Sequence, residues 1–469
     1  MTKFIDEDFL LNCTHSREMY HCFAADLPIV DLHSHLSPVA IAEDRPFDNL
    51  IDVWLDGDHY KWRAMRQCGV SEEYCTGKIP AFEKFLQWAS TLERLFGNPL
   101  YHWSHLELYR FFGVAEPLTR ANADRVWAHC NRILYEGFRP SSILSAVKAD
   151  ALTTTDDPVD NLESHRKIAG RPDQTTRVLP CWRPDSILAV DSFHFPDSIK
   201  ALSLSSRIDI SNLKDLREAL IIRLDWFSEN MCVSADHAID SCCYVNMTES
   251  QLDLVFRTAL AGGCVSEIEQ HGYKTALLSF LARQYTIRGW TQHYHIGAKR
   301  NVNTRMFNAV GPDGGFDAVG CARNVWHIGR LIDFLDSENC LPRTVLYCLN
   351  PAEYSEVLSL AGCFPRVGNG GHVQLGPAWW FNDHLDGITD QLKIFSQFGA
   401  LGTCFGMVTD SRSFVSLSRH EYFRRVLCRL LGEWVSNGLI PNDKDLLHNL
   451  ISDICYRNAL SYLSLQDQS

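Results

Sequence analysis

Two histidines separated by one residue follow a short apolar run near the N-terminus. Residues 29–35 read IVDLHSH, so His33 and His35 come directly after a candidate strand. Residues i and i+2 of a strand point to the same face, so the two imidazoles would project side by side. Two neutral imidazoles make half of a typical divalent metal site. The chain holds 19 His, so such a pair can also arise by chance or lie in solvent; its position after a strand favours the metal site.

A carboxylate and a guanidinium follow the last apolar run of the chain. Residues 408–412 read VTDSR, so Asp410 ends the run and Arg412 comes two residues later. A carboxylate at the end of a barrel's last strand can bind the same ion and also move a proton. Arg412 would face the same way, and a planar guanidinium suits substrate hydroxyls or an enediolate oxygen. The alternative for Asp410 is a helix cap or an ion pair with Arg412.

Four further features follow or interrupt the apolar runs. Arg183 ends the third run, where a structural ion pair and a substrate clamp are equally good interpretations. His295 lies on or just after the fifth run, and a lone histidine in an apolar strand is more often a core residue. Residues 58–66 read DHYKWRAMR and indicate a helix start with aromatic and basic side chains. The aromatic residues 379–381 could wall a sugar site or fill a barrel.

These residues need strands to bring them together, and the sequence offers eight candidates. Each is a short apolar run that ends in polar, Gly or Pro residues, and amphipathic helical stretches separate most of them. Strands that alternate with helices predict a parallel sheet, and eight of them suit an α/β fold of the (β/α)8 TIM-barrel type. The candidate strands are residues 28–32, 151–155, 177–181, 231–235, 290–296, 343–349, 373–381 and 403–409.

The interval between the first and second candidate strands is much longer than the others. This stretch is rich in Trp, Tyr and Leu and has helical periodicity, so it is too apolar for a linker. We expect a helical insertion subdomain packed on the barrel mouth. The predicted division is residues 1–36 for the N-terminal segment and first strand, 37–150 for the insertion, and 151–469 for the rest of the barrel.

Composition and charge exclude several classes of protein. The chain has 469 residues, 46% hydrophobic and 22% charged, which excludes a largely disordered protein. Its 44 basic and 57 acidic residues give a net charge of −13, so we expect no nucleic acid and no membrane partner. The sequence has no uninterrupted stretch of about 18 apolar residues, so we expect no membrane span. The 17 Cys without a C-x-x-C pair and the acidic, non-secretory N-terminus predict a cytoplasmic protein.

Seven short motifs follow one another along the chain. They are DLHSH at 31–35, GDHYKWRAMR at 57–66, TTDDP at 154–158, WRPD at 182–185, YHIG at 294–297, WWFND at 379–383 and TDSRSF at 409–414. In these motifs and their order the chain resembles, from end to end, the uronate isomerase family, also called glucuronate isomerase, a branch of the amidohydrolase superfamily. The motif at 57–66 is the most specific of the seven.

The resemblance implies a ligand set and a division of roles. His33, His35 and Asp410 would hold one divalent metal ion, for which the family suggests Zn²⁺. Tyr60 would meet the C1 carbonyl oxygen of an open-chain sugar, Arg412 would meet the C2 and C3 hydroxyls, and Asp410 would transfer the proton. Three further residues match motif positions near the substrate: His59, Arg183 and His295.

The implied reaction is aldose–ketose isomerisation of a hexuronate. D-glucuronate would give D-fructuronate, and D-galacturonate would give D-tagaturonate, by metal-assisted proton transfer between C2 and C1 through a cis-enediol. The implied partner is this small molecule, and we expect a homo-oligomer.

Two alternatives remain at this point. The first is a hydrolase of the same superfamily acting on a lactone or amide, although no lysine ends the fourth candidate strand near 233–237 to bridge two metal ions. The second is a catalytically silent barrel that binds sugar or acts as a scaffold. The complete set of candidate catalytic residues argues against it, because a binding protein needs no proton-moving carboxylate beside a metal.

Overall fold

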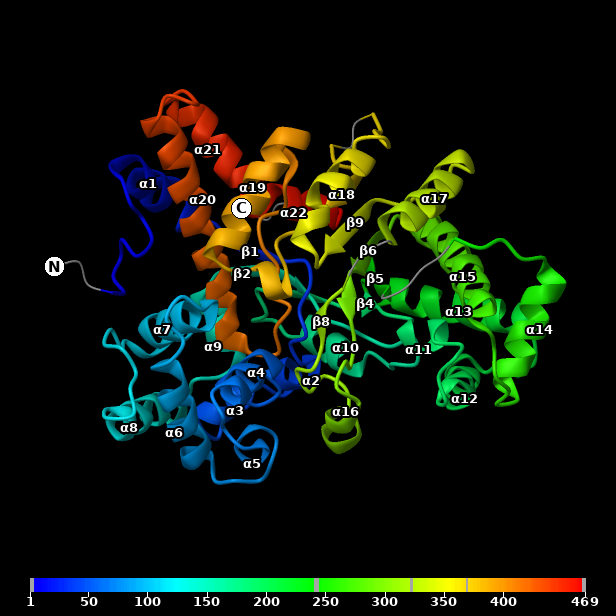
Figure 1. Ribbon diagram of the computed structural model, residues 1–469, viewed down its shortest axis with the longest axis horizontal. Helices are drawn as coiled ribbons and strands as arrows, with labels where there is room; N and C mark the ends of the chain where they lie inside the picture. The colour runs from blue at the N-terminus through cyan, green and yellow to red at the C-terminus, as the bar shows by residue number, and fades with distance from the viewer. Residues whose placement is uncertain (1–3, 240–243, 321–323, 368–369, 466–469) are drawn as a thin grey trace.

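The computed structural model describes residues 4–239, 244–320, 324–367 and 370–465. Parallel strands lie in the middle of the molecule, with helices around them (Figure 1). The strands are β1 (Ile29–Asp31), β2 (Ala149–Thr153), β3 (Arg177–Leu179), β4 (Cys181–Trp182), β5 (Ser234–Ile239), β6 (Thr291–Ile296), β7 (Ala298–Lys299), β8 (Ala318–Val319), β9 (Thr344–Cys348) and β10 (Val373–Leu375).

Seven strand positions follow one another in chain order. One sheet has the order β1-β2-β3, and a second has the order β10-β9-β6-β5-β4. Pro180 lies between β3 and β4 and interrupts the ladder, because proline has no N–H to donate. We therefore treat β3 and β4 as the two halves of one strand. A parallel bridge between Asp156 and Trp182 joins the two sheets at this point. The predicted α/β class with a parallel sheet is confirmed.

The eighth position is filled by an irregular segment, so the predicted strand at 403–409 is wrong as a regular strand. A short 3-10 helix, η4 (Leu401–Thr403), begins this stretch, and extended chain follows. The segment still lies beside the end of β1, because Asp410 N–H donates to the His33 carbonyl at 3.1 Å. Gly406 at φ +54° and Asp410 at φ +47° have left-handed backbone, which interrupts a ladder.

Two other predicted strands have different bounds. The fourth candidate, 231–235, begins later, at β5, because Met231 has φ +67° in the turn after the preceding helix. The seventh candidate, 373–381, ends early at β10, and a 3-10 turn, η3 (Trp380–Asn382), takes up its end. Despite these two shifts, the side chains of the candidate site residues still lie at the same edge of the sheet.

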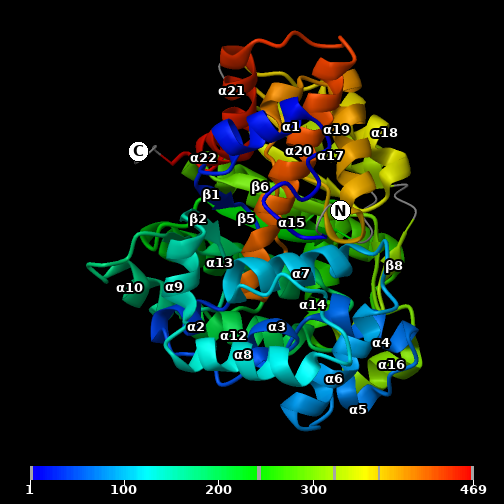
Figure 2. The ribbon, with the colours of Figure 1, turned by 90° about the vertical axis from the view of Figure 1, so that its left-hand side faces the viewer.

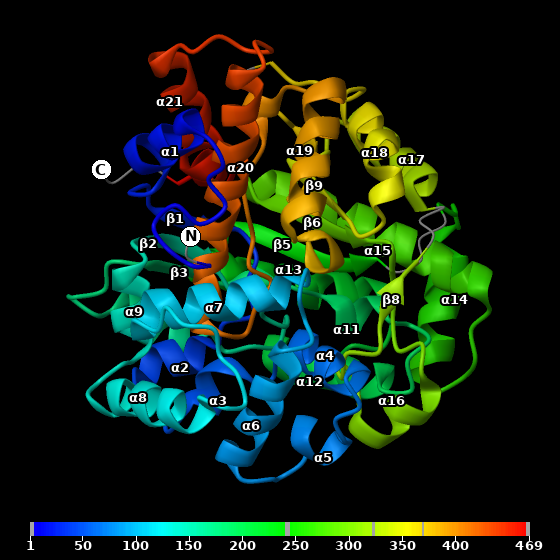
Figure 3. The ribbon, with the colours of Figure 1, turned by 60° about the vertical axis from the view of Figure 1, so that its left-hand side comes forward.

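Helices occupy the interval between β1 and β2. They gather at one end of the molecule, opposite the C-terminal helices (Figures 2 and 3). The division of the chain at residues 36 and 150 stays a prediction. These helices are α2 (Pro38–Glu43), α3 (Leu50–Trp54), α4 (His59–Gln67), α5 (Glu72–Cys75), α6 (Ala81–Leu92), α7 (Pro99–Phe112), α8 (Ala123–Tyr135) and α9 (Pro140–Ala146).

Most of the remaining helices lie around the strands, whereas α16 lies on the loop between β7 and β8, and α1 and α7 both contact α20. Strands β6 and β9 are buried along their whole length, as expected of a parallel sheet covered on both faces. None of the described helices is long and apolar enough to cross a membrane. The helices are α1 (Thr14–Met19), α10 (Glu163–Ala169), α11 (Asp185–Leu188), α12 (Phe195–Ser206), α13 (Leu213–Glu229), α14 (Glu249–Leu260), α15 (Glu267–Arg288), α16 (Thr304–Val310), α17 (Asn324–Ser337), α18 (Tyr354–Ala361), α19 (Leu385–Phe398), α20 (Ser418–Ser436), α21 (Lys444–Ser452) and α22 (Asn458–Tyr462).

Candidate active site

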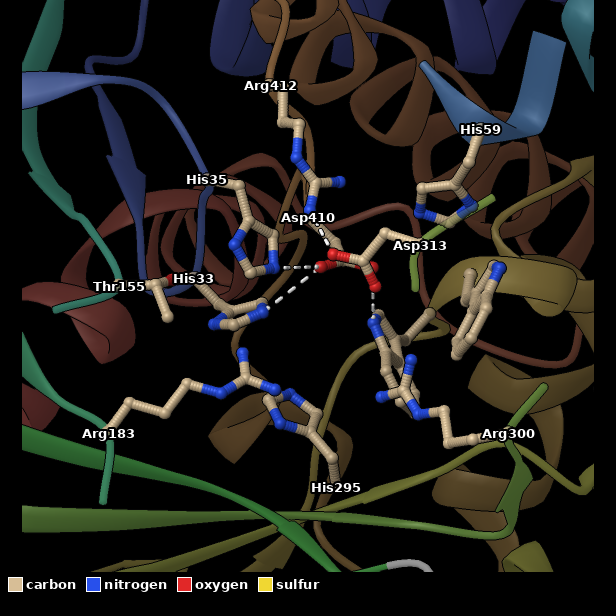
Figure 4. A pocket seen from close by; sticks show the side chains of 12 residues that line it. His33, His35, His59, Thr155, Arg183, His295, Arg300, Asp313, Asp410 and Arg412 are labelled. Atoms are coloured by element: carbon tan, nitrogen blue, oxygen red, sulfur yellow. Dashed lines mark hydrogen bonds and ion pairs between the residues drawn. The ribbon is translucent and has the colours of Figure 1, made fainter. Parts of the chain in front are cut away.

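Two imidazoles and one carboxylate converge at the carboxyl end of β1. Nε2 of His33 lies 3.1 Å from Oδ1 of Asp410, and Nε2 of His35 lies 3.2 Å from the same oxygen. The two histidines come from the extension of β1, and Asp410 comes from the segment beside it (Figure 4). The spacing predicted from the sequence therefore brings all three candidate ligands to one point.

The second oxygen of Asp410 faces two hydrogen-bond donors. Tyr60 O–H donates to Oδ2 at 3.0 Å, and Trp379 Nε1–H donates to the same atom at 2.8 Å. Tyr60 lies in the first turn of α4, which begins where the Asp58 side chain accepts the N–H of Lys61. The two carboxylate oxygens of Asp410 thus have separate surroundings, histidines on one side and neutral donors on the other.

The electrostatics fix the charge of each of these groups. Burial alone would raise the pKa of Asp410, but hydrogen bonds from His33 and His35 outweigh it and hold the pKa well below its usual range. Burial lowers the pKa of His35 to about 4, so this imidazole is neutral at pH 7. Burial, with the charge of Asp410, raises the pKa of Tyr60 well above 10, so its hydroxyl keeps its proton.

The donor set fits a divalent cation. Two imidazole nitrogens and one carboxylate oxygen, all within 4.8 Å of one another, are ligands that zinc accepts, and a catalytic site keeps further positions open for substrate. Burial lowers the pKa of His33, but the carboxylates of Asp236 and Asp410 on either side outweigh it and raise the pKa. Positive charge is therefore favoured at this point.

A second group of possible ligands shares His33 but has a different character. Asp236, on β5, lies 2.6 Å from Nδ1 of His295 and 3.1 Å from Nη1 of Arg183. Its side chain is fully buried, and the guanidinium already supplies the positive charge that this carboxylate needs. We therefore interpret Asp236 as the residue that orients Arg183 and His295, and not as a metal ligand.

All of the predicted site residues except Tyr60 line one cavity. It has a volume of about 330 Å³, at the small end of the range for ligand cavities, which suits one small molecule. Tyr60 is partly exposed and contacts two of the lining residues: its ring stacks on His59 and its hydroxyl donates to Asp410. Figure 4 shows Arg183 and His295 on one side of the three candidate metal ligands, and His59 and Arg412 on the other. The predicted lining residues are His33, His35, His59, Arg183, His295, Asp410 and Arg412.

His59 and Arg412 are positioned by close contacts. The ring of His59 stacks on that of Tyr60 with centroids 4.7 Å apart, and burial lowers the pKa of His59, with the charge of Arg412 adding to the effect. Gly57, at φ +75°, is needed here because a Cβ at this position would lie 3.2 Å from Cδ of Arg412. This contact explains why a glycine opens the motif at 57–66.

Five lining residues were not assigned from the sequence. Two of them lie on the loop formed by residues 297–320, which carries β7, α16 and β8, and two are the aromatic residues after β10. The guanidinium of Arg300 lies 4.9 Å from the ring centroid of Trp380, and Asp313 pairs with Arg412 at 2.8 Å. The five residues are Thr155, Arg300, Asp313, Trp379 and Trp380.

The sequence carried a weak signal for some of these residues. An aspartate inside the buried strand β5 is costly unless it is paired, so Asp236 could have been marked as a site residue from its position. The aromatic pair after β10 was recognised, but its role as a donor to Asp410 was not. Arg300 and Asp313 had no local signal, because a loop sequence does not show which side chains turn inward.

Comparisons with known proteins agree over the whole length of the chain. The family model of glucuronate isomerase matches residues 1–463. The uronate isomerases of Salmonella paratyphi B and Salmonella enteritidis are each 45% identical over 470 residues, covering 99% of this chain and 100% of the relative.

Solved structures show the same agreement. The uronate isomerase of Thermotoga maritima has a TM-score of 0.93 and 33% identity, over 98% of this chain and 100% of that one. The glucuronate isomerase of Caulobacter crescentus has a TM-score of 0.91 and 25% identity, over 99% and 98%. The family match and the full-length relatives show that the chain belongs to the glucuronate isomerase family of enzymes.

Proposed function

We propose that this cavity converts D-glucuronate to D-fructuronate, and D-galacturonate to D-tagaturonate, through a cis-enediol. One observation carries the proposal: the carboxylate of Asp410 faces two imidazoles with one oxygen and a tyrosine hydroxyl with the other. An isomerase that moves a proton between C2 and C1 needs a base, a proton donor and charge stabilisation within one small cavity. Asp410 and its neighbours supply these groups.

We assign His33, His35 and Asp410 as the ligands of one divalent ion per chain, for which zinc is our choice. When bound, such an ion acts as a Lewis acid that lowers the pKa of a coordinated hydroxyl. The neutral state of His35 suits this role, because metal ligands must be deprotonated.

The arginines of the cavity account for an acidic substrate. Arg183, Arg300 and Arg412 all line it, and guanidinium groups bind carboxylates through paired hydrogen bonds. Arg183 is held by Asp185 and Asp236, at 2.7 and 3.1 Å, so its orientation is fixed before substrate binds. A neutral hexose lacks the carboxylate that these groups recognise, and we expect it to be a poor substrate.

Asp410 and Tyr60 are the groups that move the proton. Asp410 is ionised, because hydrogen bonds hold its pKa low, so it accepts the proton from C2 and returns it to C1. Tyr60 is protonated and passes the second proton from the C2 oxygen to the C1 oxygen, so that it ends protonated again, while Arg412 stabilises the charge on the enediol oxygens. His59, stacked on Tyr60, and His295, held by Asp236, complete the wall around the substrate.

A single experiment tests this function. The purified protein is incubated with D-glucuronate in D2O, and the sugar is followed by NMR. We expect ketose to form with deuterium exchange at carbon. The hydrolase alternative is not favoured by the comparisons, and it predicts a hydrolytic product from a lactone panel with no ketose from the uronate.

The Tyr60→Phe variant is expected to fold and to keep its metal while kcat falls by about 10²–10⁴-fold. The change removes the hydroxyl that donates to Asp410 and leaves the donor of Trp379 in place. Tyr273→Phe is the matched control, because it removes a buried hydroxyl that donates to the Ile187 carbonyl, outside the cavity. Turnover by Tyr60→Phe at the wild-type rate would contradict the assigned role.

The Asp313→Asn variant is expected to lower KM for D-glucuronate. Asp313 pairs with Arg412 at 2.8 Å, so its carboxylate competes with an anionic substrate for the same guanidinium. Partly exposed pairs are worth about 0.2–1 kcal/mol, so KM should fall by up to about fivefold. Steady-state kinetics measure it, and Asp453→Asn, which removes a charge from an exposed pair with Arg457, is the control. An unchanged or raised KM counts against competition at Arg412.

We also propose a homo-oligomer in the cytoplasm. The described cysteines are free thiols, as a reducing compartment would keep them. Light scattering on the purified protein measures the assembly, and a mass equal to one chain would contradict the oligomer.

A further inference from the structure

Asp410 has a left-handed backbone conformation, which residues other than glycine adopt infrequently, although aspartate adopts it more readily than most. Its φ is +47°, in the left-handed region where a Cβ is disfavoured. Such a conformation persists at a site when the surroundings hold the neighbouring peptides in place. The groups that hold the peptide before Asp410 therefore decide where its carboxylate points.

Asp31 holds Thr409, the residue before Asp410, through its N–H and its side chain. Its side chain is fully buried, and Oδ1 accepts the N–H of Thr409 at 3.1 Å, while Oδ2 accepts the hydroxyl of the same threonine. Oδ1 also lies 3.4 Å from the N–H of His33. One carboxylate thus bridges the backbone of a metal-ligand strand and the residue that precedes Asp410.

Arg419, in the first turn of α20, holds the next peptide, the one that joins Thr409 to Asp410. Its guanidinium is 1% exposed and donates from Nη1 to the Thr409 carbonyl at 3.0 Å. The N–H of that peptide unit, which belongs to Asp410, donates to the His33 carbonyl at 3.1 Å. Both polar ends of the Thr409–Asp410 peptide are therefore fixed.

Arg419 also contacts the partner of Asp410. Its guanidinium lies 5.5 Å from the ring centroid of Tyr60 and 4.0 Å from that of Trp103, so it is held between aromatic rings. The carboxylate of Asp383, 3.6 Å away, supports it. A single buried cation thus contacts the ring of Tyr60 and the peptide that precedes Asp410, and it does not line the cavity.

We propose that Asp31 and Arg419 are positioning residues of the isomerase, acting through the backbone of Thr409 to aim the carboxylate of Asp410. Neither side chain lines the cavity, so neither touches the substrate. The inference rests on the proposed role of Asp410 as ligand and base. If Asp31 and Arg419 had a purely structural role, substitutions that break their contacts would lower the stability of the protein and leave the chemistry unchanged.

Two variants at Thr409 test the link to Asp31 without removing a buried charge. Thr409→Val keeps the shape of the side chain and removes the hydroxyl that Asp31 accepts, while Thr409→Ser keeps the hydroxyl. We expect Thr409→Val to lower kcat and zinc affinity by about 10-fold, the lower end of the range for residues that orient metal ligands. In Thr409→Ser, kcat and zinc affinity should both stay within about twofold of the wild-type values.

Two variants on α20 test Arg419. Arg419→Lys keeps the charge and loses the planar fork, so kcat should fall about 10–100-fold with little change in KM. Arg424→Lys is the matched control, because Arg424 is also buried on α20 and donates to the Leu27 and Pro28 carbonyls at 2.7 Å, away from the cavity. This control should lower Tm and leave kcat and zinc affinity unchanged.

Zinc affinity by competition with a chelator, kcat, KM and Tm are measured for all four variants. Wild-type kcat and zinc affinity in Thr409→Val and Arg419→Lys, with only Tm lowered, would overturn the proposal. If Arg419→Lys does not fold, the two Thr409 variants decide. Failure of the wild-type protein to bind zinc or to isomerise D-glucuronate would instead overturn the proposed function.

Discussion

The Asp410→Asn variant is expected to lose turnover of D-glucuronate by about 10³-fold or more, because removal of a general base alone costs about 10²–10⁴-fold. The amide cannot accept the C2 proton, and it also weakens the ligand set shared with His33 and His35. Exchange of the C2 hydrogen with D2O should disappear together with ketose formation. Both are followed in one NMR experiment.

Asp156→Asn is the matched control for this variant. Asp156 is also a buried carboxyl at a strand end, and burial raises its pKa to about 6. It accepts the Thr154 hydroxyl and the Cys181 N–H and does not line the cavity. Asp156→Asn should keep most of the activity; rapid C2 exchange in Asp410→Asn would mean that another group is the base.

Removal of the metal ion should abolish activity and lower thermal stability together. A ligand that binds only the native state stabilises it by about 2.7 kcal/mol at 100 times its Kd, so Tm should rise when zinc is returned. We expect one zinc per chain in the wild-type protein and almost none in His35→Ala, because His35 is one of the three ligands that we propose. Metal analysis and calorimetry measure these two quantities.

His165→Ala is the control for the histidine variant. His165 is buried beside Asp156, at 3.7 Å, but lies away from the cavity. Its loss should leave the zinc content at one per chain. Two ions per chain in the wild-type protein, or full zinc occupancy in His35→Ala, would refute the assigned ligands.

Local periodicity was enough to predict the central part of the site. His33 and His35 share a face because side chains in a strand alternate, and Asp410 could be placed because the ends of parallel strands meet at one edge. These arguments need no knowledge of distant contacts. The same arguments placed Arg183 and His295 at this edge, and the structure brings both to the cavity.

The error at the eighth strand has a specific physical cause. An apolar run at 403–409 looks like a strand, but Gly406 and Asp410 adopt positive φ, and Asp31 provides a side-chain acceptor where a strand would provide a carbonyl. When a side chain takes the place of a backbone carbonyl as acceptor, the pattern of apolar and polar residues in the sequence does not show it. The contacts of Arg300 and Asp313 were missed for the related reason that they depend on how a long loop folds back.

The loop at 297–320 is fastened to the helix that carries His59 and Tyr60. Arg63 Nη1 donates to the Asp317 carbonyl at 2.6 Å, and Arg66 Nη1 donates to the Gly314 carbonyl at 2.5 Å. Together α4 and the loop form one fixed wall of a cavity of about 330 Å³, which they line with His59, Arg300 and Asp313. We expect this fixed wall to select by size as well as by charge, because a cavity at the small end of the range for ligand sites suits a single sugar acid better than a polyuronide.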